Sequence, residues 1–283
     1  MKVLVTGSTG FIGHYVVTAL LEAGHEVLAT SSNPNNAARK PWFPGVKYIP
    51  LDLADLDTSQ NYYAYFHQPD AMIHLAWEGL PRYKDDFHTE INLPRHILLL
   101  SNLTKNGLKN LTVAGTCLEY GMQEGCLKEN IDTDPVIAYP LAKNELRKAL
   151  ERQQKSLDFN LKWVRLFYMF GEGQNPNSLL SQLDKAVVQG ETVFNMSGGE
   201  QVRDYLPVEK VADCLVKIAE QESLSGIINC CSNKPVKVKD FVSAYLKQKK
   251  SNIQLNLGYY PYNDYEPMEF WGDDTRLKTI LKK

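Results

Sequence analysis

Short apolar runs alternate with longer amphipathic stretches along most of this chain. The runs have the length and the β-branched content of buried strands, and the stretches between them repeat apolar residues at helical spacing. An alternation of this kind predicts a parallel, doubly wound α/β sheet with right-handed crossovers. The predicted strands cover residues 2–6, 26–30, 47–50, 71–75, 111–114, 161–166 and 227–231, and the clearest helices cover 11–23, 86–106 and 138–150.

The pattern becomes less regular after about residue 170. Gly, Asn and Pro become more frequent there, and the last third is rich in aromatic side chains. We predict a Rossmann cofactor-binding domain over residues 1–169, to which residues 205–234 return. Most of 170–283 is predicted to form a smaller, less regular substrate-binding lobe. Such a lobe would close over the C-terminal ends of the strands, where open α/β sheets bind ligands.

A glycine-rich turn separates the first predicted strand from the first helix, and residues 7–13 read GSTGFIG. The first glycine permits a tight turn, the second lets the backbone approach a pyrophosphate, and the third lets the helix pack closely on the strand. Free N–H groups and the positive dipole end of the helix favour phosphate at the same place. The motif therefore predicts a dinucleotide cradle. Its expected cofactor contacts are Gly7, Thr9, Gly10, Phe11, Ile12 and Gly13.

A second motif lies far downstream, where residues 139–143 read YPLAK. On a helix, Tyr139 and Lys143 lie one turn apart on the same face. A free tyrosine has a pKa of about 10, and a neighbouring ammonium group lowers that pKa. Tyr139 could then act as a general acid or base on a hydroxyl group or a ketone. Because such pairs are common on amphipathic helices, the interpretation depends on the glycine turn as well.

The overall composition is that of an ordinary globular protein. The chain has 283 residues and a formal net charge of −2, which gives no reason to expect a nucleic-acid or membrane partner. No apolar run is long enough to span a bilayer, and the first strand begins too early for a signal peptide, so we expect a cytoplasmic protein. The five cysteines show no metal-type spacing, and we expect reduced thiols and no metal site.

Together the motifs resemble the extended short-chain dehydrogenases/reductases, in the branch of nucleotide-sugar epimerases, dehydratases and ketoreductases. The resemblance covers nearly the whole chain and includes residues 6–13 (TGSTGFIG), 74–76 (HLA), 139–143 (YPLAK) and 203–208 (RDYLPV). It implies a nucleotide-sugar substrate, a nicotinamide cofactor and a catalytic triad of Thr116, Tyr139 and Lys143. The further cofactor contacts that it implies are Asp52, Leu53, Leu75, Ala76 and Asn92, in addition to Tyr139 and Lys143.

The end of the second strand bears on the choice of cofactor, because an acidic group there holds the ribose 2′-hydroxyl of NAD. This chain has no acid at that place. Ser31 and Ser32 leave room for a 2′-phosphate, and Arg39 could pair with it. We therefore predict NADP as the preferred cofactor, with NAD as the alternative.

The residues after Thr116 bear on the reaction. Family dehydratases carry Asp-Glu there, whereas this chain has Cys117 and Leu118. Glu119 follows, but on a strand it would point to the side opposite Leu118. We therefore predict that Tyr139, as general acid, helps to reduce the C4 ketone of a nucleotide-linked 4-keto-6-deoxy-sugar. The alternatives are a nucleotide-sugar epimerase with tightly bound NAD(P) and a non-catalytic NADP-binding sensor.

The resemblance also points to substrate contacts. Arg203 is expected to hold the diphosphate, Asn177 and Arg276 are further candidates, and Thr116 is expected to contact the sugar. The helix over 86–106 is more apolar than one buried face requires. Family members commonly dimerise by pairing this helix with the helix of the Tyr-Lys pair, so we expect a homodimer.

Overall fold

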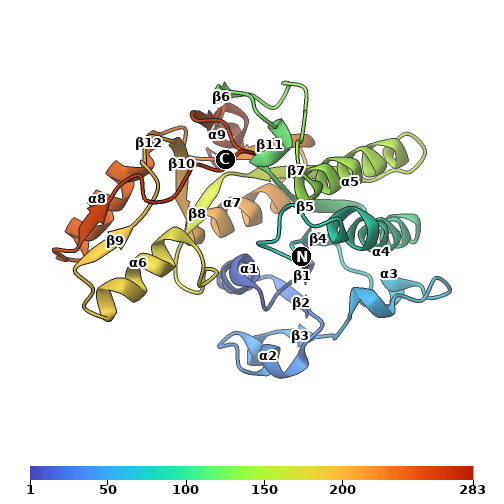
Figure 1. The fold of residues 1–283 in the computed structure, drawn as a ribbon. Helices are drawn as coiled ribbons and strands as arrows, with labels where there is room; N and C mark the ends of the chain where they lie inside the picture. The colour runs from blue at the N-terminus through green and yellow to red at the C-terminus, as the bar shows by residue number, and fades with distance from the viewer. Residues whose placement is uncertain (283) are drawn as a thin grey trace.

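A seven-stranded parallel sheet forms the centre of the computed structural model, which describes residues 1–282 (Figure 1). The strands lie in the order β11-β7-β5-β4-β1-β2-β3, which confirms the predicted doubly wound class. Each predicted strand is present, and the edge strand β3 is shorter than predicted. The strands are β1 (Lys2–Thr6), β2 (Glu26–Thr30), β3 (Lys47–Tyr48), β4 (Ala71–His74), β5 (Asn110–Thr116), β7 (Asn160–Leu166) and β11 (Gly226–Cys230).

Helices cover both faces of the sheet, which explains why its central strands read as continuous apolar runs. Each face has its own apolar core, one beneath α1 and α7 and the other beneath α4 and α5. The chain leaves β1 on one side of the sheet and β4 on the other, so a crevice opens at the carboxyl ends of these two neighbouring strands. The helices are α1 (Phe11–Glu22), α7 (Val208–Glu220) and α9 (Thr275–Leu281) on one face, and α3 (Tyr62–Tyr65), α4 (Leu93–Lys105) and α5 (Ala138–Gln154) on the other.

The helix predicted over 86–106 is divided in two. A π-helical turn, His88–Asn92, precedes α4, and Pro94 lies in the first turn of α4. Because proline has no N–H, it cannot continue a regular α-helical ladder from the preceding turn. The side-chain amide of Asn92 stabilises the junction by donating to the carbonyl of Glu78 at 2.9 Å.

A second group of elements lies beyond α1 and forms the left-hand part of Figure 1. Its apolar core lies between α6 and α8, separate from the two cores of the main sheet. The chain reaches this lobe after β7 and returns through α7 to β11 of the main sheet. The domain boundary predicted at residue 170 stays a prediction. The elements are β8 (Tyr168–Phe170), α6 (Leu179–Val188), β9 (Val193–Asn195), β10 (Val202–Pro207), β12 (Pro235–Lys237), α8 (Val238–Gln248) and β13 (Gln254–Asn256), while β14 (Phe270–Gly272) pairs with β6 (Gly125–Leu127).

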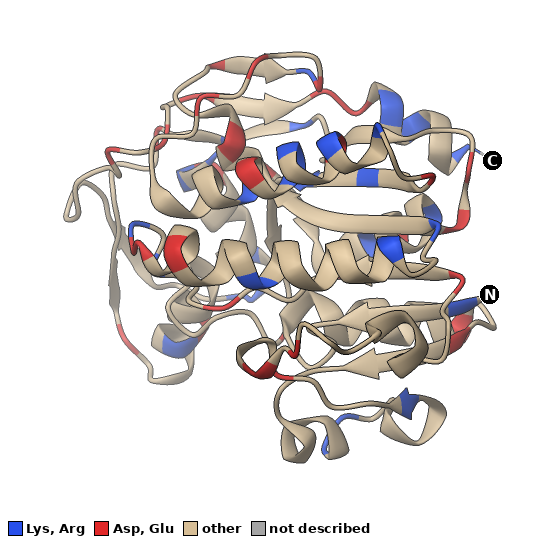
Figure 2. Ribbon diagram, turned by 90° about the vertical axis from the view of Figure 1, so that its right-hand side faces the viewer, with Lys and Arg blue, Asp and Glu red and all other residues tan. Residues whose placement is uncertain are grey.

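The surface carries charges of both signs. In the view of Figure 2, basic and acidic residues are interspersed along the same helices and loops. Among the helices that the structure describes, none combines the length and the apolar character needed to cross a membrane.

Candidate active site

The glycine turn after β1 is packed too tightly for larger residues. Gly7 has a φ of +66°, and a Cβ atom there would lie 2.8 Å from the backbone nitrogen of Ala76. A Cβ atom at Gly13 would lie 2.1 Å from the carbonyl oxygen of Gly7. The turn is closed by a hydrogen bond of 3.0 Å from the Gly10 N–H to the Gly7 carbonyl. These glycines therefore bring α1 and the loop after β4 against the turn, as the motif predicts.

The start of α1 has features that suit a phosphate. Gly10 is its N-cap, no side chain caps it, and its first turn carries no acidic residue. The first N–H groups of a helix have no partner within the helix, and the dipole makes this end positive. The turn borders a hollow of about 210 Å³ at the ends of β1, β2 and β4. Predicted cofactor residues that line it are Gly7, Thr9, Gly10, Ser31, Ser32, Leu53, Leu75 and Ala76.

Among the predicted cofactor residues that do not line this hollow are Asp52, Asn92 and Arg39. The Asp52 carboxylate accepts a hydrogen bond of 2.8 Å from the Ala54 N–H and so begins a short 3₁₀ turn. Asn92 is buried in the π-helical turn. Arg39 is exposed after the short helix α2 (Pro34–Ala38). The structure gives two of these side chains local backbone contacts and leaves the third at the surface, and their roles in cofactor binding stay predictions.

The same hollow carries no cation among its described lining residues. Ser31 lines it at the end of β2, as predicted, but its hydroxyl is paired with the hydroxyl of Tyr48 at 2.9 Å. Glu78 also lines the hollow, and its carboxylate forms an ion pair of 3.7 Å with Arg95. The basic partner that was predicted for a 2′-phosphate is therefore missing from the place where it was expected.

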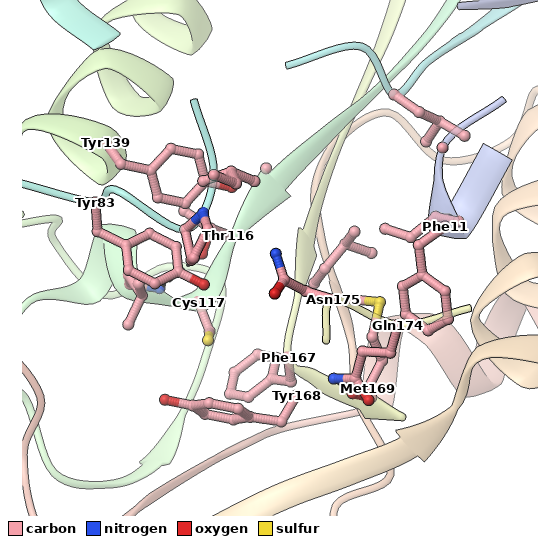
Figure 3. A pocket seen from close by; sticks show the side chains of 18 of the residues that line it. Phe11, Tyr83, Thr116, Cys117, Tyr139, Phe167, Tyr168, Met169, Gln174 and Asn175 are labelled. Carbon is pink, nitrogen blue, oxygen red and sulfur yellow. Dashed lines mark hydrogen bonds between the residues drawn. The ribbon is translucent and has the colours of Figure 1, made fainter. Parts of the chain in front are cut away.

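A larger cleft of about 520 Å³ adjoins the start of α1 (Figure 3). Phe11, Ile12 and Gly13 line it on one side, and Thr116 and Tyr139 line it on the other. Thr116 lies at the end of β5 and Tyr139 in the first turn of α5. In Figure 3 the side chains of these two residues lie close together, with those of Tyr83 and Cys117 beside them.

Lys143 lies beneath this cleft and does not line it. The side chain is almost completely buried, and its ammonium group donates to the Ala114 carbonyl at 2.8 Å. The same nitrogen lies 4.0 Å from the centre of the Trp77 ring, an arrangement that favours the charged form. Burial nevertheless lowers the pKa of Lys143 to about 7.

The predicted lowering of the Tyr139 pKa is not confirmed. Burial raises the pKa of Tyr139 above its usual value, and the neighbouring Tyr83 acts in the same direction. Thr116 acts in the opposite direction through a hydrogen bond, and Lys143 is not among the causes of the shift. The physical reason is that the ammonium group is directed at the Ala114 carbonyl and the Trp77 ring. Tyr139 is therefore a protonated phenol at neutral pH.

Glu119 is held away from the cleft. Its Oε1 accepts hydrogen bonds of 2.9 Å from the Thr116 N–H and from the Trp163 indole, and its Oε2 accepts one of 3.0 Å from the Arg165 guanidinium. The carboxylate is completely buried. It positions the backbone of Thr116 and cannot reach a substrate that occupies the cleft.

A second hollow of about 500 Å³ contains two of the predicted substrate residues, Arg203 and Asn177. The Arg203 guanidinium is almost fully buried and donates to the Val202 and Met268 carbonyls at 2.9 and 3.2 Å. It also forms an ion pair of 3.0 Å with Glu266. The structure thus brings these two candidates together, with the guanidinium already anchored to the protein.

The third substrate candidate, Arg276, lies apart from the other two, and its role stays a prediction. It lies on α9, and its guanidinium donates to the Ser225 carbonyl at 2.8 Å. It lines a separate surface depression beside β11, which shares no residue with the cleft or with the Arg203 hollow. The sequence near the C-terminus does not reveal this separation, because the packing of α9 against α7 and β11 is a tertiary contact.

The sequence gives no indication of a role for Glu266, and it suggests Tyr83 only as one of several aromatic side chains that could stack on the sugar or the base. Both line the cleft. Tyr83 comes from the loop after β4, and its carbonyl accepts a hydrogen bond of 3.0 Å from the Tyr139 N–H, at the otherwise uncapped start of α5. Both residues belong to irregular segments without a motif, so the only sequence signal was the aromatic character of these segments.

The central sheet, the glycine turn and the Thr116–Tyr139 pair at the crevice define a nicotinamide-dependent enzyme of the extended short-chain dehydrogenase/reductase class. The sequence pattern of the NAD dependent epimerase/dehydratase family matches residues 3–231. The chain belongs to this family.

Two characterised relatives align over nearly the whole chain. The dTDP-6-deoxy-L-talose 4-dehydrogenase (NAD(+)) of Aggregatibacter actinomycetemcomitans is 29% identical, over 96% of this chain and 99% of the relative. The UDP-arabinose 4-epimerase 1 of Arabidopsis thaliana is 24% identical, over 99% of this chain and 74% of the relative.

Solved structures show the same fold. UDP-glucuronic acid 4-epimerase from Bacillus cereus, in complex with UDP-glucuronic acid and NAD, superimposes with a TM-score of 0.85 at 23% identity, over 100% of this chain and 93% of that one. MoeE5, in complex with UDP-glucose and NAD, gives a TM-score of 0.82 at 23% identity, over 100% and 92%. Where the name of one of these relatives or complexes includes a cofactor, that cofactor is NAD, so the predicted preference for NADP is not supported.

Proposed function

We propose that this protein is an NAD-dependent oxidoreductase that reduces the C4 ketone of a nucleotide-linked 4-keto-6-deoxy-sugar. The observation that carries the proposal is the meeting of Thr116 and Tyr139 in the cleft beside the start of α1. Cys117 and Leu118 line the same wall, at the positions where a dehydratase would carry its two acids. The cleft thus contains one proton donor and one hydroxyl group that can orient the substrate. These are the side-chain functions that a ketone reduction requires.

Each group in the cleft has its own role in this proposed reaction. The dinucleotide supplies the hydride when it is bound, and the turn from Gly7 to Gly13 with the start of α1 would hold its phosphates. The Tyr139 hydroxyl donates its proton to the oxygen on C4. The raised pKa of Tyr139 keeps this proton in place at neutral pH, which suits the direction of reduction. Thr116 orients the same oxygen. The protonation state of Lys143 determines the charge directly behind the cleft.

NAD is the cofactor that we propose, in place of the NADP predicted from the end of β2. The hollow beside Ser31 and Ser32 has no cation among its described lining residues to pair with a 2′-phosphate, and the carboxylate of Glu78 is paired with Arg95. The relative that is a 4-dehydrogenase is named for NAD(+).

Dehydration finds less support in this cleft. It requires one carboxylic acid to protonate a leaving hydroxyl and one carboxylate to take a proton. Glu119 is sequestered in its buried network, and Glu266 is the single acidic residue among the described residues that line the cleft.

A C4 epimerase is the second candidate, because two of the relatives described above are named as 4-epimerases. Both reactions use a proton-transferring tyrosine at the C4 oxygen. They differ in whether the dinucleotide is consumed. The sensor alternative has least support, because the Thr116–Tyr139 pair lies open to the cleft rather than buried out of reach.

Absorbance of the reduced dinucleotide, followed on mixing the protein with NADH and dTDP- or UDP-linked 4-keto-6-deoxy-sugars, tests the proposal. We expect a loss of absorbance stoichiometric with the sugar, and a slower loss with NADPH. No loss, together with an altered NMR spectrum of a nucleotide-linked hexose, would support the epimerase instead. Neither change would contradict both functions.

We also propose a homodimer formed through α4 and α5. Ile91, just before α4, and Leu141 on α5 are large apolar residues with exposed fractions of 39% and 41%. The two helices pack against each other on the same face of the sheet, so their outer sides can form one continuous surface. Light scattering on a sizing column tests this, and Leu141→Glu should convert a dimer to a monomer.

A further inference from the structure

Glu266 lies at the boundary between the two hollows of the substrate side. It lines the cleft of Thr116 and Tyr139, and it also lines the hollow of Arg203 and Asn177. Its side chain is 11% exposed, so most of the carboxylate is enclosed by protein.

The carboxylate is fixed in place by one of its two oxygens. Oε2 accepts a hydrogen bond of 2.6 Å from the Tyr168 hydroxyl and one of 3.0 Å from the Arg203 guanidinium. Arg203 is itself anchored by two backbone carbonyls. Oε1 has no hydrogen-bond partner among residues 1–282. One oxygen therefore holds the geometry, and the other remains an open acceptor.

The ion pair with Arg203 does not cancel this charge on the cleft side. After burial, Glu266 is the largest cause that raises the pKa of Cys117, and it outweighs the opposing effect of Arg203. Glu266 also raises the pKa of Tyr83, to which Arg203 makes no contribution. Cys117 and Tyr83 both line the cleft, so a second negative charge placed there would be opposed in the same way.

The rest of the lining carries no positive charge that would balance an anion. Among the described residues that line the cleft, none is Lys, Arg or His. The wall near Glu266 is formed by Tyr83, Phe167 and Tyr168, and Figure 3 shows their rings around the cavity. Aromatic surface of this kind suits a methyl group or a ring face, and the polar groups elsewhere in the lining, such as Gln174 and Asn175, are uncharged.

We propose that Glu266 determines which sugar the cleft accepts: it receives a hydrogen bond from a hydroxyl of a neutral hexose and excludes sugars that carry a carboxylate. The inference rests on the proposed function, since it assumes that a nucleotide-linked sugar occupies the cleft. It sets this chain apart from the B. cereus relative, whose solved complex contains UDP-glucuronic acid.

Calorimetric binding to the NAD-loaded protein tests this without any turnover. Two pairs of ligands are compared, UDP-glucose with UDP-glucuronic acid and dTDP-glucose with dTDP-glucuronic acid, so that the nucleotide is the same within each pair. Repulsion between two like charges in a partly shielded site should make the neutral sugar bind at least ~10-fold more tightly than the anionic one. In Glu266→Gln the preference should fall to about threefold or less.

Two further variants control for structural effects. Glu266→Asp keeps the charge and should keep most of the discrimination, even if overall affinity falls. Glu269→Gln removes an exposed carboxylate from the same segment, outside the cleft, and should leave the preference unchanged. NAD affinity, measured for every variant, reports whether the cofactor side is intact.

The outcomes separate the two claims. Equal affinity for neutral and anionic sugars in the natural protein, or an unchanged preference in Glu266→Gln, would overturn the role of Glu266 alone. Failure of all four ligands to bind would overturn the nucleotide-sugar assignment. Selective binding of neutral sugars without oxidation of NADH by any keto-sugar would leave the selection standing and contradict the proposed reductase.

Discussion

The cofactor side and the substrate side of this site are built in different ways. On the cofactor side, the glycine turn is packed through its backbone and lies within residues 7–13, although residues that follow β2 and β4 also line the hollow beside it. On the substrate side, side chains from five or more separate segments meet, including Tyr83, Thr116, Tyr168, Arg203 and Glu266. A backbone cradle is encoded locally, whereas a side-chain pocket is assembled by tertiary packing. This difference explains why the first was predictable and the second was not.

The largest expected effect is on the rate of the chemical step, which takes place where the cofactor side and the substrate side meet. Tyr139→Phe removes the proton donor and should reduce kcat by about 10³-fold, the range typical of a lost general acid. NAD binding should change little, because the glycine turn is untouched. Steady-state kinetics and NAD fluorescence titration measure the two quantities. Turnover close to that of the natural protein would contradict the assignment of Tyr139.

The next effect tests whether the cofactor side depends on backbone packing. Gly13→Ala places a Cβ atom 2.1 Å from the Gly7 carbonyl, a contact that must displace the turn. We expect NAD affinity to fall at least ~10-fold, because the cradle can no longer close. Gly24→Ala is the matched control, since a Cβ there meets no atom within 4 Å, although its φ of +78° adds some backbone strain. Equal NAD affinity in Gly13→Ala and the natural protein would show that the turn is not the cradle.

Lys143 lies beneath the cleft, and its burial leads to a prediction about how the stability of the protein depends on pH. The folded state lowers the pKa of Lys143 to about 7, from an ordinary value of 10.5. Between these values the unfolded chain binds more protons, so this group makes the cofactor-free protein more stable as pH rises from 7 toward 10. The slope is at most about 1.4 kcal/mol per pH unit.

Urea unfolding at pH 7, 8 and 9 measures that slope. In Lys143→Met the contribution should disappear, and the stability difference between variant and natural protein should change with pH. Lys148→Met, which removes a half-exposed lysine from the same helix, should leave the slope as it is. A slope that is identical in all three proteins would mean that Lys143 stays fully charged in the folded state.

The smallest effects test which polar residues belong to the substrate side. Asn177 lines the Arg203 hollow, so Asn177→Ala should raise the KM for the nucleotide sugar about threefold to tenfold, as expected for one lost hydrogen bond. Arg276 lies in a separate depression, so Arg276→Gln should leave KM within about twofold. The reverse order would restore the expectation that we drew from the sequence.

Sequence and structure agree where interactions are local. The spacing of Tyr139 and Lys143 predicts one helix face, and both residues lie on α5. What spacing does not reveal is the environment: Lys143 is directed at Ala114 rather than at the tyrosine hydroxyl. Likewise, the sequence predicts that Glu119 faces away from Leu118, but it does not show which residue Glu119 pairs with. That partner is Arg165, on a strand 46 residues further along the chain.

The sequence by itself determined the order of strands and helices, the glycine turn and the position of the Tyr-Lys pair. These follow from the period of apolar residues and from the stereochemistry of glycine, which act over a few residues. Only the tertiary structure decided that Arg276 lies apart from the cleft, that burial sets the pKa of Lys143 and Tyr139, and that Glu266 meets Arg203 across 63 residues. Burial and charge are properties of the packed molecule, and contacts between distant segments establish them.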